Sequence, residues 1–240
     1  MKLTNNKILI TGGASGIGLG LAERFIEEGN TVIICGRRES LLNEVKEKHP
    51  ALTTKVCDLS DENERLELFH WIQENHSDLN VLVNNAGIQN WMNIGDDDFY
   101  QKANHEITTN ITAPIHLTTL FTKLPALNTI INVTSGLAFV PLAKVPVYCA
   151  TKAFMRSFTL SLRYSLKPSI EVIEMIPPAL NTDLGATGLH NEFPPVSDFV
   201  AAVFQQLQSG ATELTFGSSE GRAKANQETI AEYFKLLNPE

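Results

Sequence analysis

Cysteine is scarce in this sequence, which has only three such residues among 240. Cys35, Cys57 and Cys149 are an odd number, and their spacings fit neither a disulfide framework nor a zinc site. The six histidines are scattered along the chain, without an HxH or HxxxH pair. We therefore expect reduced thiols in a cytoplasmic protein, and no metal site.

Positive charge and long apolar runs are also limited. The 27 acidic residues outnumber the 19 basic ones and give a formal net charge of -8. This balance argues against nucleic acid and against an anionic membrane as a major partner. No segment reaches the roughly 18 apolar residues of a membrane helix, and the N-terminus lacks an apolar core of signal-peptide length. We predict a soluble protein, without membrane insertion, that binds a small molecule.

The sequence does contain an alternation of short β-branched runs and longer amphipathic stretches. Seven runs predict strands: KILIT, TVIIC, TTKVC, LNVLVN, TIINVTS, IEVIEMI and ELTF. Several are apolar at nearly every position, which is typical of parallel strands covered on both faces. Helices are predicted between them, at about 17–28, 38–48, 61–76, 97–123, 147–166, 197–208 and 221–237. This order predicts an α/β, doubly wound Rossmann fold with a seven-stranded parallel sheet and helices on both faces.

The chain is expected to form one domain over residues 1–240. With 43% hydrophobic residues it can bury one sizeable core, and no repeat, low-complexity tract or linker divides it. One long irregular segment, at about 177–198, follows the sixth predicted strand. A loop of that length in a compact domain is usually a lid or a binding loop. We predict that this segment is a substrate loop.

The stretch TGGASGIG, residues 11 to 18, joins the first predicted strand to the first predicted helix. At such a turn, free backbone N–H groups and the helix dipole favour a phosphate. Glycine lets a pyrophosphate approach the main chain, which explains Gly12, Gly16 and Gly18 at these offsets. The turn predicts a dinucleotide site. Taken alone, the same glycines are also compatible with a turn that is merely tight.

The second predicted strand is followed by Gly36, Arg37 and Arg38. In dinucleotide-binding folds an acid at this place selects NAD, whereas an arginine suits the 2′-phosphate of NADP. Gly36 stands where the acid is expected, so we predict NADP(H) as the preferred cofactor, with NAD(H) possible. Two alternatives stay open from the residues alone: solvated arginines at a helix start, and Glu39 as a ribose ligand.

Ser135, Tyr148 and Lys152 lie in the segment SGLAFVPLAKVPVYCATK. Tyr148 and Lys152 are four residues apart, so on a helix they lie one turn apart on the same face. An adjacent ammonium favours the phenolate, which would let Tyr148 exchange a proton near neutral pH. Ser135 ends the fifth predicted strand, where its hydroxyl would hold a substrate carbonyl oxygen together with Tyr148. The YxxxK spacing alone is common in ordinary amphipathic helices.

In combination, the TGxxxGxG turn, NNAG at 84–87, and the order of Ser135, Tyr148 and Lys152 resemble the short-chain dehydrogenase/reductase family over essentially the whole chain. The resemblance implies hydride transfer between a nicotinamide and a carbonyl or alcohol group, with Tyr148 as general acid/base. Within the family, PPALNTDL and the N-terminus are most similar to the bacterial oxidoreductases encoded with D-alanyl-teichoic-acid genes.

The same resemblance assigns further residues. It implies Asn110 as a fourth catalytic residue, which would hold a water-linked proton path from Lys152 through a kinked helix. Pro114 supports an irregular helix there, since the carbonyl of residue 110 lacks its partner. Thr182 is expected at the nicotinamide end, although Pro178 replaces the usual glycine before it. The predicted cofactor contacts are Gly12, Ser15, Gly16, Ile17, Gly18, Arg37, Arg38, Asp58, Leu59, Asn85, Ala86, Gly87, Tyr148, Lys152 and Thr182.

Other functions fit parts of this pattern. A dinucleotide-sensing interaction protein would share the glycine turn, but it has no need of a phenol and an ammonium one turn apart. A nucleotide-sugar epimerase or dehydratase shares YxxxK, but it normally carries a larger C-terminal region. We also predict a homodimer or homotetramer, because the stretches 97–123 and 147–166 are apolar on more than one face.

Overall fold

Seven parallel strands form one sheet in the computed structural model, which describes residues 1–239. They are β1 (Lys7–Thr11), β2 (Thr31–Gly36), β3 (Thr53–Val56), β4 (Val81–Asn84), β5 (Thr129–Val133), β6 (Glu171–Ile176) and β7 (Glu213–Thr215). Their order across the sheet is β3-β2-β1-β4-β5-β6-β7, which places the topological switch point between β1 and β4. The predicted doubly wound Rossmann fold is confirmed.

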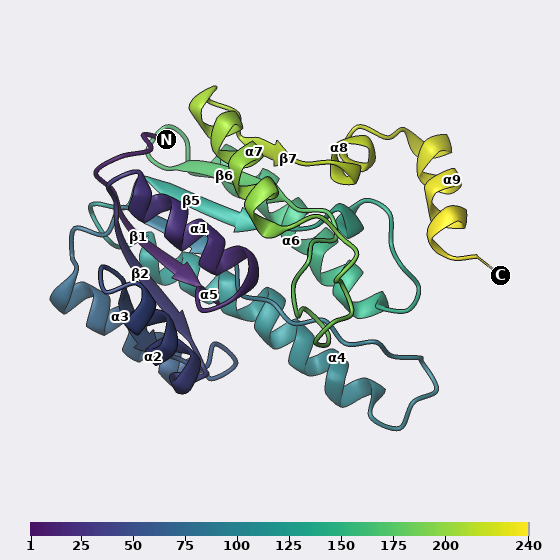
Figure 1. Ribbon diagram of the computed structural model, residues 1–240, viewed down its shortest axis with the longest axis horizontal. Coiled ribbons are helices and arrows are strands. Elements are labelled where there is room, and N and C mark those ends of the chain that lie inside the picture. Colours follow the sequence, from purple (N-terminus) through teal and green to yellow (C-terminus); the bar gives the residue numbers. More distant parts are fainter. Residues whose placement is uncertain (240) are drawn as a thin grey trace.

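Helices cover both faces of the sheet (Figure 1). One core cluster packs α1 (Gly16–Glu27), α2 (Glu39–Lys48) and α7 (Val196–Gln208) against one face. A second cluster packs α3 (Glu62–Asn75), α5 (Ala113–Phe121) and the end of α6 (Pro146–Ser165) against the other. Successive β1 residues alternate between them, since Ile8 and Ile10 belong to the first cluster and Leu9 to the second. Burial on both faces is the reason that these strands are continuously apolar in sequence.

The predicted helix at 97–123 contains an irregular turn. It consists of α4 (Phe99–Ile107), a π-helical turn η1 (Thr108–Thr112) and α5. The N–H of Ala113 bonds the carbonyl of Thr108, five residues earlier. Pro114 has no N–H, so the carbonyl of Thr109 has no helical donor four or five residues ahead. The irregularity therefore occurs beside Pro114.

The prediction of one helix over 221–237 is wrong. The structure has two helices, α8 (Ser218–Ala223) and α9 (Gln227–Leu237). Asn226 caps α9, because its side chain accepts a hydrogen bond of 2.9 Å from the N–H of Thr229. Asparagine competes with the helical backbone for hydrogen bonds, so it favours a cap over a helix interior.

The chain between β6 and α7 contains no helix or strand. It folds back toward the glycine turn, where a side chain at Gly16 would contact the Thr182 methyl group at 3.4 Å. This segment therefore lies over the carboxyl ends of the strands, where doubly wound folds bind ligands. Among residues 1–239, no helix combines the length and the apolar character needed to cross a bilayer.

Candidate active site

The glycine turn packs directly against the NNAG segment. Gly12 has a φ of 65°, in the left-handed region, and a Cβ at this position would lie 3.0 Å from the Cα of Ala86. A Cβ on Gly18 would overlap the carbonyl oxygen of Gly12. The Ser15 side chain makes no capping hydrogen bond at the start of α1. The N–H groups of the first turn of α1 are therefore available to an anion.

Side-chain hydrogen bonds hold the ends of β1 and β4 together behind this turn. The Thr11 hydroxyl accepts from the N–H groups of Asn85 and Ala86, each at 3.0 Å. The Asn85 amide donates to the Thr11 carbonyl at 2.8 Å. Asn84 donates to the Asn132 side chain on β5 at 2.9 Å. These bonds fix the relative position of the glycine turn and NNAG.

Two arginines lie at the carboxyl end of β2, both exposed to solvent. Arg38 donates to the Ser15 hydroxyl at 3.2 Å, which brings it to the glycine turn. Arg37 lies near Asp58. Burial raises the pKa of Asp58, but the hydrogen bonds from Ser60 and the positive charge of Arg37 outweigh burial and lower it overall. Asp58 is thus ionised and turned toward Ser60, while Arg37 and Arg38 remain the cationic groups of this edge.

Tyr148 and Lys152 lie on the first turns of α6, and only 5% of each residue is exposed. Pro146 begins the helix, a position at which its missing N–H costs nothing. The Lys152 Nζ lies 5.6 Å from the centre of the Tyr148 ring and donates to the Val133 carbonyl at 2.9 Å. Ser135 caps the short 3-10 helix η2 (Gly136–Ala138) and accepts from the Leu137 N–H at 3.1 Å.

Burial controls the ionisation of this pair. It raises the pKa of the Tyr148 phenol well above its usual value, and a hydrogen bond with the Ser135 side chain lowers this pKa in part. Burial also lowers the pKa of Lys152 from 10.5 to about 8. Lys152 is therefore still mostly cationic at neutral pH, close to a phenol that the protein alone keeps protonated.

Asn110 lies in the π-helical turn η1 and is buried beside Lys152. Its amide donates to the Ile88 carbonyl at 2.9 Å and to the Thr151 hydroxyl at 3.1 Å, and its Oδ1 accepts from the Ile88 N–H at 2.9 Å. A Cβ on Gly87 would lie 3.4 Å from the Asn110 Oδ1 and 3.5 Å from the Lys152 Nζ. Gly87 therefore leaves these two side chains room to approach each other.

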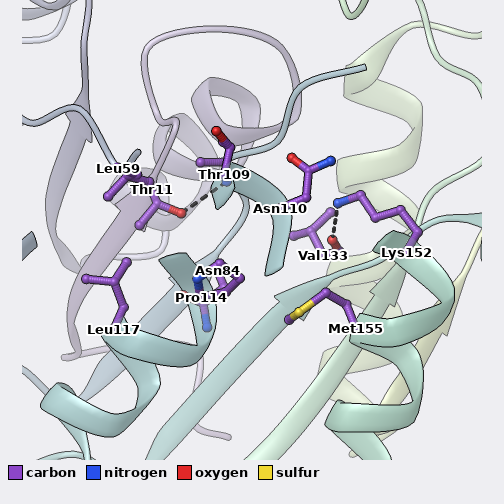
Figure 2. Close-up of a pocket in the computed structure, with 11 residues that line it drawn as sticks. Thr11, Leu59, Asn84, Thr109, Asn110, Pro114, Leu117, Val133, Lys152 and Met155 are labelled. Atoms are coloured by element: carbon purple, nitrogen blue, oxygen red, sulfur yellow. Dashed lines mark hydrogen bonds between the residues drawn. The ribbon is translucent and has the colours of Figure 1, made fainter. Parts of the chain in front are cut away.

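A small cavity lies behind Lys152 (Figure 2). Its volume is about 10 Å³, which is close to the space that one water molecule needs. Thr109 and Asn84 line it, and the Oδ1 of Asn84 is buried with no hydrogen-bond partner among residues 1–239. Figure 2 shows Asn110, Lys152 and Val133 grouped at one end of this cavity. Polar atoms that can bind a water thus surround the cavity.

A cleft of about 1100 Å³ runs along the carboxyl ends of the strands. Most residues predicted at the cofactor line it: Gly12, Ser15, Gly16, Ile17, Arg37, Arg38, Asp58, Leu59, Asn85, Ala86, Gly87, Tyr148, Lys152 and Thr182. Gly18 packs behind the turn, Asn110 lines the small cavity, and Ser135 lies against Tyr148. Gln89 also lines the cleft, and Glu106 accepts from Asn90 beside it, but no sequence motif predicts either residue. Their only signal in the sequence is their place, just after NNAG and one helical turn before Asn110.

Comparison with known proteins identifies the family. The family model described as short chain dehydrogenase matches residues 6–192. The chain belongs to the short-chain dehydrogenase family. The predicted family is confirmed, and this short-chain dehydrogenase is an oxidoreductase enzyme.

Two curated relatives and one solved structure show the range of similarity. This short-chain dehydrogenase is 44% identical to the uncharacterized oxidoreductase DltE of Bacillus subtilis (strain 168), over 99% of this chain and 98% of that protein. It is 31% identical to the NADP-dependent 3-hydroxy acid dehydrogenase YdfG of Escherichia coli O6:H1, over 77% of this chain and 75% of that protein. A short chain dehydrogenase of Burkholderia cenocepacia J2315, solved in complex with NADP, superposes with a TM-score of 0.84 at 24% identity, over 98% of this chain and 99% of that one.

Proposed function

We propose that this enzyme transfers a hydride between NADP(H) and a carbonyl or alcohol substrate, with Tyr148 as general acid/base. The observation that carries the proposal is the buried pair of Tyr148 and Lys152, which lines the same cleft as the glycine turn and two arginines. A phenol and an ammonium buried one turn apart have a use in proton transfer and little use in packing. Its three cysteines are buried free thiols, which supports a cytoplasmic location.

The residues of the cleft fit a dinucleotide. The first-turn N–H groups of α1 would hold the pyrophosphate, and Gly12 and Gly18 keep side chains away from it. Arg37 and Arg38 would bind the 2′-phosphate, which favours NADP(H) over NAD(H). Asp58 and Leu59 would flank the adenine. When bound, the nicotinamide supplies or accepts the hydride.

Ser135 and Tyr148 would hold the substrate oxygen together. The Ser135 hydroxyl accepts from the Leu137 N–H and lies against Tyr148, so a carbonyl oxygen placed beside both could accept from both hydroxyls. Tyr148 would then give the proton that completes reduction, or take it in the reverse direction. The cationic Lys152 favours the phenolate that this exchange requires, against the opposing effect of burial.

Asn110 would keep a proton path open behind Lys152. It binds the Ile88 backbone in both directions and so holds the wall of the small cavity in place. A water in that cavity would find the Oδ1 of Asn84 and the carbonyl of Thr109, neither of which has a partner in the helix or sheet. Protons from Lys152 would reach solvent through this water.

The test is to separate cofactor binding from turnover at Tyr148. NADPH oxidation is screened against aldehydes, ketones, quinones and oxo acids, the last because a relative is named for 3-hydroxy acids. With an active substrate, Tyr148→Phe should lower kcat/KM by about 10² to 10⁴ while NADPH binding is retained. Tyr100→Phe, at a tyrosine of α4 that is 76% exposed, is the matched control. An active Tyr148→Phe variant would overturn the role of Tyr148 as general acid/base. NADPH binding without turnover of any carbonyl in the screen would favour the dinucleotide-sensing alternative instead.

A further inference from the structure

One wall of the cleft, residues 88–92, is fastened to its neighbours at every second residue. Ile88 exchanges two hydrogen bonds of 2.9 Å with the Asn110 side chain. The N–H and the side-chain amide of Asn90 both donate to the Oε1 of Glu106, which lies one helical turn before Asn110. The N–H of Met92 donates to the carbonyl of residue 144 at 3.2 Å. The backbone on both sides of Gln89 is therefore fixed.

Gln89 is the member of this wall whose polar group has no partner. It lines the cleft together with Tyr148 and Lys152, and only 9% of it is exposed. Within residues 1–239, no hydrogen bond joins its side-chain amide to another group. The segment after β6 covers it closely, since a Cβ on Gly185 would lie 3.2 Å from the Gln89 Oε1. The Gln89 amide is not among the fully buried unpaired polar atoms, so it still reaches the cleft. A ligand that displaces water from this amide must offer a matching polar group, since an unpaired amide in a desolvated site costs free energy.

The surroundings of Gln89 favour a neutral group on that ligand. The buried carboxyl of Glu106 lies behind the wall, and Asp183 lines the cleft. A carboxylate on the ligand, placed at Gln89, would lie near these two acids. It would have no cation to pair with, because Lys152 is already placed beside Tyr148. A hydroxyl can both donate to and accept from an amide, so it satisfies Gln89 without charge.

We propose that Gln89 is a specificity-determining residue that hydrogen-bonds a neutral polar group, such as a hydroxyl, close to the reacting carbonyl of the substrate. This inference rests on the proposed function and narrows it to substrates with two oxygen functions. The hydrogen bonds of Asn110 to Ile88 and of Glu106 to Asn90, called the clamp below, hold the backbone around Gln89 in place. The side chain of Gln89 therefore loses little conformational freedom when the substrate binds. A substrate without the second group leaves Gln89 unpaired and binds more weakly.

The experiment compares hydroxyacetone with butanone, two ketones of similar shape that differ by a hydroxyl in place of a methyl group. Each is titrated calorimetrically into the protein saturated with NADP⁺, so that no turnover is needed. We expect hydroxyacetone to bind at least about tenfold more tightly than butanone. In Gln89→Met, which keeps an unbranched side chain of similar length, the two affinities should agree within about twofold. Gln101→Met on the exposed face of α4 is the control and should leave the ratio unchanged.

The outcomes separate this inference from the function on which it rests. Failure of NADP⁺ to bind would overturn the proposed function and this inference with it. Normal NADP⁺ binding with equal affinities for the two ketones, or with no binding of either, would overturn only the role of Gln89. An unchanged preference in Gln89→Met would do the same.

Glu106 provides a second measure of the clamp. Glu106→Gln keeps an acceptor for Asn90 and should preserve the preference for hydroxyacetone. Glu106→Leu removes that acceptor, frees Asn90 and should reduce the preference although Gln89 is still present. If Glu106→Leu kept the full preference, the clamp would have no part in presenting Gln89.

Discussion

The two arginines after β2 differ in their contacts. Arg38 donates to Ser15, whereas Arg37 has no hydrogen bond or ion pair within residues 1–239. Arg37 is therefore the guanidinium that is free to meet a 2′-phosphate with paired hydrogen bonds. Gly36 before it has nothing within 4 Å of an added Cβ, so the site has open space for that phosphate.

We predict that the protein binds NADPH more tightly than NADH and that Arg37→Asp narrows or reverses this preference. An aspartate would repel the phosphate and accept from a ribose 2′-hydroxyl, so the ratio of the two affinities should change by about 10- to 100-fold. Calorimetric titration of both cofactors measures it. Lys48→Glu, at the exposed far end of α2, changes the charge equally and should leave the ratio unaffected. Equal affinities in the unmodified protein would contradict the role given to Arg37.

The buried ammonium of Lys152 should lower the free energy of unfolding of the protein. Its pKa is lowered from 10.5 to about 8, so below pH 8 the folded protein buries a cation that the unfolded chain leaves in water. This corresponds to roughly 3 kcal/mol. Removal of the ammonium would also take the Nζ donor from the Val133 carbonyl, which costs about 1 kcal/mol. The cost of burying the cation is present in full below pH 8 and disappears as the pH rises toward 10.5.

We therefore predict that Lys152→Met raises the free energy of unfolding of the free protein at neutral pH by about 2 kcal/mol. NADPH binding and turnover should both fall further than in Tyr148→Phe. The Lys152 cation is expected both to bind the cofactor and to favour the Tyr148 phenolate, and the variant loses both effects. Urea unfolding across the pH range measures the change in stability. The gain of Lys152→Met over the unmodified protein should shrink above pH 8. If Lys152→Met were less stable than the unmodified protein at neutral pH, burial of the Lys152 ammonium would not be destabilising and the prediction would be wrong.

At the scale of elements, an ion pair between a buried carboxylate and a partly exposed arginine joins β6 to α6. Glu174 is fully buried in β6 and accepts from Arg156 of α6 at 2.6 Å and from the Thr134 hydroxyl at 2.7 Å. Arg156 also lies 4.2 Å from the centre of the Phe139 ring, in the segment between Ser135 and Tyr148. The pair thus ties α6, which carries the proposed catalytic residues, to the sheet beneath it.

We predict that Arg156→Met costs about 3 kcal/mol of stability, since it leaves a buried carboxylate without its cation. Burial raises the pKa of Glu174, opposed by Thr134 and Arg156. Without Arg156 this pKa rises further, so the folded state gains stability as the pH falls through it. Urea unfolding at about pH 7.5 and about pH 5.5 should therefore show a smaller deficit at the lower pH. The double variant Arg156→Met with Glu174→Gln should recover most of the loss, and failure to recover would show that packing on Phe139 dominates.

Much of the site could be predicted because its parts are local in sequence. The glycine turn, NNAG and YxxxK each lie within eight or fewer consecutive residues, and the order of parallel strands brings their carboxyl ends to one edge. Gln89 and Glu106 could not be found in this way. The hydrogen bond between Glu106 and Asn90 joins a helix to a loop, and no short sequence motif predicts it. A glutamate in an amphipathic stretch is normally exposed to solvent.

At the scale of the whole molecule, apolar surface is concentrated on two adjacent helices. Ile107, at the end of α4, and Phe154 on α6 are each 42% exposed, and Phe154 stacks on Phe158 at 6.2 Å. Leu160 and Tyr164 are two further exposed side chains on α6. This face, formed by Ile107, Phe154, Phe158, Leu160 and Tyr164, is called the α4–α6 face below. Several large apolar side chains exposed on two neighbouring helices are typical of an interaction surface.

We predict that the protein forms a dimer or tetramer in which the α4–α6 face meets the same face of a second copy. A two-fold axis would pair Phe154 with apolar side chains of its partner, so Phe154→Asp should place unpaired charges in the interface and dissociate it. Light scattering at micromolar concentration should give at least about twice the 26.5 kDa of one chain for the unmodified protein and about 26.5 kDa for Phe154→Asp. Leu236→Asp, at a residue of α9 that is 77% exposed, is the control for loss of surface hydrophobicity and should stay oligomeric. A mass of one chain for the unmodified protein would overturn the prediction, and dissociation by Leu236→Asp alone would move the interface to α9.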